Sequence, residues 1–205
     1  MSTLRAFHGD PQLKADLLAE VAQHRLHDQI VKGTYGQGGN GDWKGCAVGC
    51  SLHSLNKKRG ANYSTSDHSA FEAGAGVPRQ LAHLQDYLFE NLQEPTHIDW
   101  PERFWRAIPI GADLELIGPR FVHWLLIDAA ELTKHEPTKR ALTDCAELYR
   151  RWIEGDRPTD REFLELLALA DFAALAARAD FAARADFAER VQQQADKLLE
   201  LLEAA

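Results

Sequence analysis

The chain carries the segment WKGCAVGCSLH at residues 43–53, directly after a glycine-rich stretch at residues 36–42. On an α-helix with 3.6 residues per turn, residues four and seven positions apart lie within about 60° of one another. A helix over this segment would therefore place Cys46, Cys50 and His53 on one face. That arrangement predicts one of two kinds of site, a metal site or a reactive thiol.

Helical periodicity continues on both sides of this segment, and long alternating runs of Val, Ile and Thr are absent from the sequence. Asp10 is a suitable N-cap for a helix with Pro11 at its first position, and this helix is expected to end at Gly33. Pro78 and Pro101 are each expected to open a further helix. The sequence therefore predicts an all-α protein with a compact helical body over residues 1–157.

The last part of the chain, residues 158–205, predicts one long Ala-rich helix that is capped by Thr159 and contains neither Gly nor Pro. At 1.5 Å per residue such a helix would span about 65 Å. Its apolar residues recur in steps of three and four, as in a coiled-coil seam. Two interpretations stay open: a helix packed on the body or on a second subunit, and an arm dedicated to a homo-oligomer or a protein partner through residues 159–205.

The composition excludes several classes of function. The net charge is −8, with 23 basic against 31 acidic residues, which argues against a nucleic-acid partner and against a basic helix lying on a membrane. The apolar runs are shorter than the roughly 20 residues that a membrane span needs. Three cysteines and no secretory signal predict a cytoplasmic protein with free thiols.

Four short motifs occur in order along the chain. The first is FHGDP at residues 7–11, and the second is KGCAVGC at residues 44–50, followed by His53. The third is His68 with Glu72, shortly before Val77 and Pro78, and the fourth is IPIGADL at residues 108–114. Together they resemble a family of uncharacterised bacterial and bacteriophage proteins with a KGCAVGCxxH motif and an Ala-rich repetitive C-terminal helix. The resemblance covers most of residues 7–130. The tail departs from it, because Asp-Phe-Ala repeats replace the family's Ser-Ala-Ala-like repeats. The resemblance implies that the Cys/His segment matters and implies no particular activity.

A metal site is the first interpretation of the motif. Cys46, Cys50 and His53 supply three ligands that suit zinc or another borderline metal, and His68 or Glu72 would supply the fourth. The alternative is that both thiols pack between helices, since free cysteine is among the most buried residue types.

Thiol chemistry is the second interpretation. Cys46 stands at the expected N-terminus of a helix, where backbone N–H groups favour the thiolate and lower its pKa. His53 would then act as the base, and Asp86 or Glu72 would orient it. Cys46 and Cys50 could also form a redox disulfide, although side-chain directions on one helix would strain it.

Polar residues recur every three or four positions in two stripes: Glu20, His24 and Asp28 on the first helix, and His83, Asp86 and Glu90 on the helix after Pro78. Facing stripes of this kind hold metals in some helical bundles, but the Glu-x-x-His pairs of that class are missing. We interpret both stripes as solvated helix faces.

These observations lead to two functional hypotheses. The first is a cytosolic protein whose Cys/His site binds a metal or carries out thiol chemistry on a small ligand. The second is a non-enzymatic, phage-associated interaction module that acts through its Ala-rich helix.

Overall fold

The computed structural model describes residues 4–27, 29–39, 42–162 and 187–205. In this part of the chain the secondary structure is helical, with two isolated β-bridges and no strand, so the all-α prediction is confirmed. The chain divides into two compact units. One contains Met1–Glu115 together with Val191–Ala205, and the other contains Leu116–Arg190. This division differs from the expected boundary after residue 157, because the end of the chain returns to the first unit.

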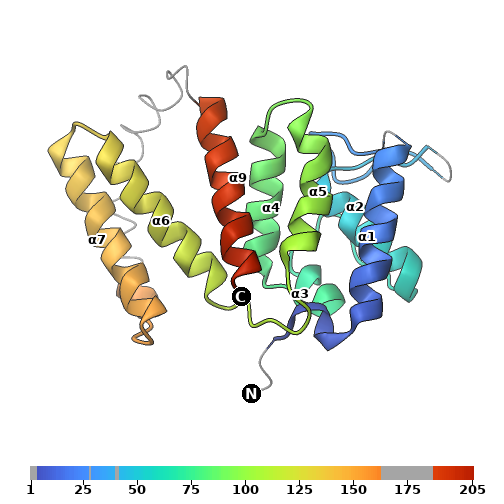
Figure 1. Ribbon diagram of the computed structural model, residues 1–205, viewed down its shortest axis with the longest axis horizontal. Coiled ribbons are helices and arrows are strands. Elements are labelled where there is room, and N and C mark those ends of the chain that lie inside the picture. Colours follow the sequence, from blue (N-terminus) through green and yellow to red (C-terminus); the bar gives the residue numbers. More distant parts are fainter. Residues whose placement is uncertain (1–3, 28, 40–41, 163–186) are drawn as a thin grey trace. The chain divides into compact units, whose positions relative to one another are not determined.

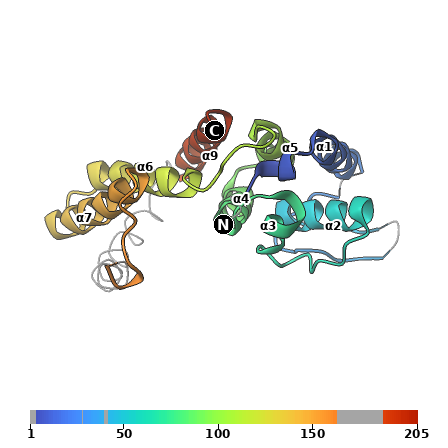
Figure 2. The same cartoon turned by 90° about the horizontal axis from the view of Figure 1, so that it is seen from below.

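The first unit is a two-layer helical body. Figure 2 shows α9, α5 and α1 in one layer and α4, α3 and α2 in the other. Burying one face of each helix against the opposite layer creates a single core. The elements are a 3₁₀ turn η1 (Ala6–Gly9), α1 (Pro11–Leu26), α2 (Ala47–Arg59), α3 (Ala70–Ala75), α4 (Arg79–Asn91), α5 (Thr96–Ala107) and the greater part of α9 (Phe187–Glu203).

The second unit contains a helical hairpin. α6 (Ile117–Leu132) and α7 (Glu136–Ile153) lie side by side, joined by residues 133–135 (Figure 1). After α7, Thr159 Oγ1 accepts the N–H of Glu162 at 3.3 Å, and the Glu162 carboxylate accepts the N–H of Thr159 at 2.8 Å. This reciprocal pair is a capping box at the start of a helix, so the predicted cap at Thr159 is confirmed.

The expected long C-terminal helix needs correction. The helix described at the end of the chain, α9, has 17 residues and is not notably long. Residues 163–186 of the expected helix lie outside the described residues. The part of α9 from Val191 onward belongs to the first unit, and its residues Val191, Ala195, Leu198 and Leu202 are 0 % exposed.

Local start signals explain most helix boundaries. The Asp10 side chain accepts the N–H of Gln12 at 2.8 Å, and Pro11 occupies the first position of α1, as predicted. Pro78 is the N-cap of α4. Pro101 behaves differently from the prediction, because it lies inside α5 rather than at its start. Pro101 is buried in the core, as are Trp100 and Phe104 of the same helix.

The core of the first unit is rich in aromatic side chains. Trp105 is fully buried, its ring centroid lies 5.1 Å from that of Phe71, and its Nε1–H donates to Ser51 Oγ at 2.9 Å. Ser51 in turn donates to the carbonyl oxygen of Ala47 at 2.7 Å. This chain of hydrogen bonds fixes α5 against the first turns of α2, which is the helix that carries the cysteine motif. Among the described helices, none combines the length and the apolar character that crossing a membrane requires.

Candidate functional site

The cysteine motif forms the start of α2, but Cys46 is not inside the helix. It is the N-cap residue, with an extended backbone (φ −70°, ψ −176°), and α2 begins at Ala47. Its Sγ accepts the N–H of Gly49 at 3.5 Å, and the side chain is 1 % exposed. Because an N-cap lies outside the helical repeat, the shared-face geometry expected for Cys46, Cys50 and His53 does not apply to it.

The loop before α2 is held against the helix by backbone pairing. Gln37 and Lys44 exchange two hydrogen bonds of 2.9 Å, and the Cys46 N–H donates to the carbonyl oxygen of Thr34 at 2.7 Å. Gly49 permits this close contact, since a Cβ atom there would lie 1.9 Å from the carbonyl oxygen of Tyr35. The glycines of the motif thus bring the loop, and Tyr35 with it, onto the first turn of α2.

Cys46 meets two carboxylates from another helix. One ligand atom from each of Cys46, Asp86 and Glu90 lies within 4.8 Å of the other two, and this is the one such group of three or more His, Cys, Asp and Glu side chains among the described residues. Asp86 and Glu90 are four residues apart on α4, so they share a face of that helix. The site therefore combines the start of α2 with the second half of α4.

Hydrogen bonds hold both carboxylates in place. The Tyr35 hydroxyl donates to Asp86 Oδ2 at 2.8 Å, and His68 Nε2 lies 3.1 Å from the same oxygen. The hydrogen bond to Asp86, together with desolvation, raises the pKa of Tyr35 to about 12, so the phenol remains a donor at neutral pH. Glu90 accepts the N–H of Gly33 at 3.1 Å with each of its oxygens. Both acids are thus positioned by residues outside α4.

His68 is anchored on both ring nitrogens. Its Nδ1 lies 3.2 Å from the carbonyl oxygen of Ser66, and the ring stacks on His83 with centroids 4.1 Å apart and planes 10° apart. Both partners of His68, the Ser66 carbonyl and the Asp86 carboxylate, are acceptors, so each ring nitrogen faces an oxygen.

The electrostatics of Cys46 contradict the expected reactive thiolate. Burial raises the pKa of the Cys46 thiol to about 12, and nearby Asp86 contributes in the same direction, while the hydrogen bond from the Gly49 N–H opposes the shift. Desolvation and a neighbouring negative charge both disfavour the thiolate more than a helix N-terminus favours it. In the metal-free protein, Cys46 is therefore a neutral thiol.

We expect Cys46 of the metal-free protein to react slowly with iodoacetamide near neutral pH. Only the thiolate attacks, so the rate should rise about tenfold per pH unit. This rise should continue well above pH 8.5, whereas the rate of a free thiol levels off near its pKa of about 8.5. Peptide mapping by mass spectrometry measures the modification of each cysteine, and the urea-unfolded chain is the control with an ordinary thiol titration. Fast modification of Cys46 below pH 8.5 in the folded protein would contradict the raised pKa.

The other motif residues lie elsewhere. Cys50 is fully buried, its Sγ donates to the carbonyl oxygen of Gly45 at 3.3 Å, and burial raises the pKa of its thiol. The thiols of Cys46 and Cys50 are both free. His53 stacks on Trp43, with ring centroids 4.1 Å apart, and lies beside His24 in a separate pocket. The Glu72 carboxylate accepts the N–H of Arg79 at 3.0 Å and so caps the start of α4.

Of the five expected ligands, the structure thus brings Cys46 and His68 to the same acid, Asp86, and places Cys50, His53 and Glu72 at three other points. Sequence reasoning missed that Asp86 and Glu90 lie beside Cys46 and that Tyr35 donates to Asp86. The available signal was the i, i+4 spacing of the two acids, which we interpreted as a solvated face. The solvated-face interpretation is wrong for Glu20 and His24 of the first stripe, which are 7 % and 4 % exposed, whereas His83 of the second stripe is exposed.

Comparison with models of protein families, with curated proteins and with solved structures finds no match for this chain. The resemblance to a bacterial and bacteriophage family therefore stays a prediction, and the site must be interpreted from its own geometry.

Proposed function

We propose that the first unit is a metal-binding domain in which Cys46 Sγ and the carboxylates of Asp86 and Glu90 ligate a divalent transition-metal ion, with zinc the best suited. The observation that carries this proposal is the convergence of three ligand atoms within 4.8 Å from two helices. Thiolate, imidazole and carboxylate are the side-chain groups that bind zinc in proteins, whereas a thiolate disfavours magnesium and calcium.

The surroundings of the three residues support a metal more than a nucleophile. A nucleophilic cysteine needs a lowered pKa and a base, whereas the pKa of Cys46 is raised and its nearest titratable partners include two acids. A bound cation reverses this balance, because it offsets the two carboxylates and stabilises the thiolate. The hydrogen bonds from Tyr35 to Asp86 and from Gly33 to Glu90 fix the ligand orientation in the way that outer hydrogen bonds do at metal sites.

The site borders solvent at Asp86 and Tyr35. Cys46 is buried, but the Asp86 side chain is 16 % exposed and Tyr35 is 38 % exposed. Three protein ligands leave one position of a tetrahedral zinc ion for water or for a donor atom of a small ligand. This is the geometry through which the domain would act on a small molecule, with His68 as a positioning residue on Asp86.

Zinc binding by variants tests the proposal. Metal-free wild type should bind zinc with thiolate ligation, and Cys46→Ser and Asp86→Asn should each abolish binding at this site. Tyr35→Phe should weaken it by about 10- to 100-fold, because it removes only an orienting hydrogen bond. Equilibrium dialysis with elemental analysis measures the affinity, and the thiolate-to-cobalt charge-transfer absorption of the Co²⁺-loaded protein reports the sulfur ligand.

Cys145→Ser is the matched control, because Cys145 lies in the second unit on α7 and should leave the absorption unchanged. A wild-type protein that shows no charge-transfer absorption with Co²⁺, or a Cys46→Ser variant that retains it, would refute the site.

A further inference from the structure

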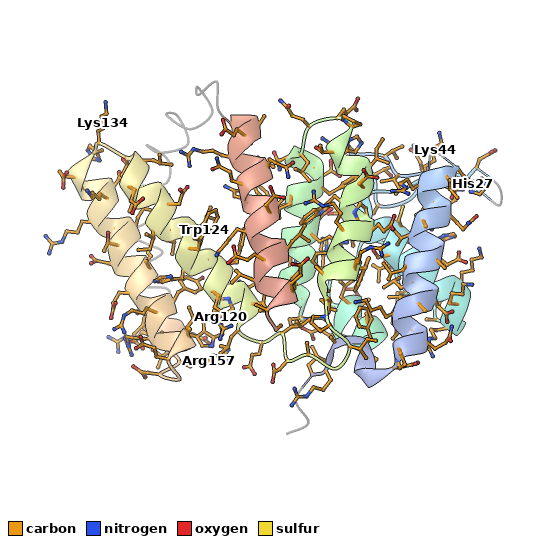
Figure 3. All side chains as sticks on the ribbon, in the orientation of Figure 1. His27, Lys44, Arg120, Trp124, Lys134 and Arg157 are labelled. Atoms are coloured by element: carbon orange, nitrogen blue, oxygen red, sulfur yellow. The ribbon has the colours of Figure 1, made fainter. Side chains whose placement is uncertain are left out.

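A second pocket lies in the first unit, between α1, the loop before α2, and α2 itself. Its volume is about 630 Å³, and it opens to solvent. Its lining includes Glu20, His24, His27, Trp43, His53 and Lys57. His27 is the C-cap of α1, and Figure 3 labels it together with Lys44 of the adjoining loop.

Two imidazoles from different helices meet in this pocket. His24 Nε2 on α1 lies 3.4 Å from His53 Nδ1 on α2, and the two ring planes are inclined at 56°. The contact is a hydrogen bond between the two rings, and its length of 3.4 Å exceeds the usual upper limit of about 3.2 Å for nitrogen donors. It equals the distance of about 3.4 Å between two nitrogens that bind one tetrahedral ion at 2.0–2.1 Å.

The tautomer of His24 is fixed by a neighbour. Its Nδ1 lies 2.7 Å from Oε1 of Gln29, which only accepts, so Nδ1 carries the hydrogen and Nε2 presents a lone pair toward His53. Desolvation lowers the pKa of both imidazoles. A histidine ligand that donates its other N–H to an oxygen is the usual arrangement at metal sites.

The orientation of His53 is also fixed. Its ring stacks on Trp43 with planes 10° apart. Trp43 in turn lies against the glycines of the loop, since a Cβ atom on Gly45 would come within 2.6 Å of its ring. Trp43 is thus a positioning residue for His53, and the glycine-rich loop makes room for it.

We propose that His24 Nε2 and His53 Nδ1 form a second metal site, for a borderline divalent ion such as Zn²⁺, Co²⁺ or Ni²⁺, distinct from the Cys46 site. Imidazole is the shared ligand preference of these ions. The remaining coordination positions face the open pocket and take water or a small anionic ligand. Glu20 lines the same pocket, where its ion pairs with Lys57 (2.8 Å) and Lys58 (3.1 Å) balance its charge.

A Co²⁺ titration of the metal-free full chain separates the two sites. Ion bound between His24 and His53 should quench the fluorescence of Trp43, which stacks on a ligand, without adding thiolate absorption. Wild type should bind two ions. His53→Gln and His24→Gln should each bind one, lose the quenching and keep the thiolate absorption, whereas Cys46→Ser should keep the quenching.

Matched controls make this result specific. Trp43 is one of five tryptophans, so Trp43→Phe should remove the quenched part of the emission. His135→Gln, an exposed histidine of the second unit, should change neither the stoichiometry nor the quenching. Circular dichroism checks that each variant is folded. If His24→Gln, at the more buried position, does not fold, His53→Gln alone tests the site.

Two outcomes would overturn the proposal: no quenching of wild type by Co²⁺, or quenching that persists in folded His53→Gln. Neither outcome bears on the Cys46 site, because the charge-transfer absorption reports that site separately.

Discussion

Replacing Gly49 with alanine should destabilise the first unit by about 3 kcal/mol or more, at the upper end of what overpacking costs. The added Cβ would lie 1.9 Å from the carbonyl oxygen of Tyr35 and 2.7 Å from its carbonyl carbon. These are backbone atoms, so no side-chain rotation relieves the clash. Either α2 or the loop before it must move, and the loop is held by the pairing of Gln37 with Lys44.

The same substitution should impair the candidate metal site. A displaced loop carries Tyr35 away from Asp86 and Gly33 away from Glu90, so both carboxylates lose a partner. Urea denaturation measures the free energy of unfolding, and Co²⁺ titration measures the site in the folded fraction. Gly39→Ala is the matched control in the same loop, because none of the described atoms lies within 4 Å of its added Cβ. If Gly49→Ala were as stable as Gly39→Ala, the close contact between loop and helix would be disproved.

Removing residues 191–205 should unfold the first unit. This segment buries Val191, Ala195, Leu198 and Leu202 completely. Burying a Val or Leu side chain contributes about 1.5–3 kcal/mol, so the three larger side chains together contribute about 4.5–9 kcal/mol. That loss is comparable to the total stability of about 5–15 kcal/mol of an ordinary domain. Circular dichroism and limited proteolysis of the chain truncated after Arg190 measure the effect.

Point variants separate packing from simple shortening of the chain. Leu198→Ala should cost about 2–5 kcal/mol, whereas Glu203→Ala, on the exposed side of α9, should cost less than about 0.5 kcal/mol. The alternative interpretation of the tail, an arm for a second subunit or a partner, expects a truncated body that stays folded and only loses association. A stable, cooperative truncated protein would therefore favour the arm.

Local physics explains what could be predicted about the helices. A helix start depends on residues within one turn, so Asp10 with Pro11 and Thr159 with Glu162 are recognisable from the sequence. The same reasoning is wrong for Pro101, because tertiary packing, and not the local chain, keeps it inside α5. It is also wrong in expecting a solvated stripe on α1. Glu20 is buried by contact with Lys57 of α2, and His24 by contact with Trp43 of the loop before α2.

The sequence by itself determined that this chain is helical, where many of its helices begin, and that Cys46 stands at the start of one of them. Only the tertiary structure decided which residues surround that cysteine. Asp86 and Glu90 arrive from a helix 40 residues further along the chain, and His53 turns instead toward His24. Helical periodicity specifies which side chains share a face. It does not specify which helices pack together, because that choice depends on burial summed over the whole core.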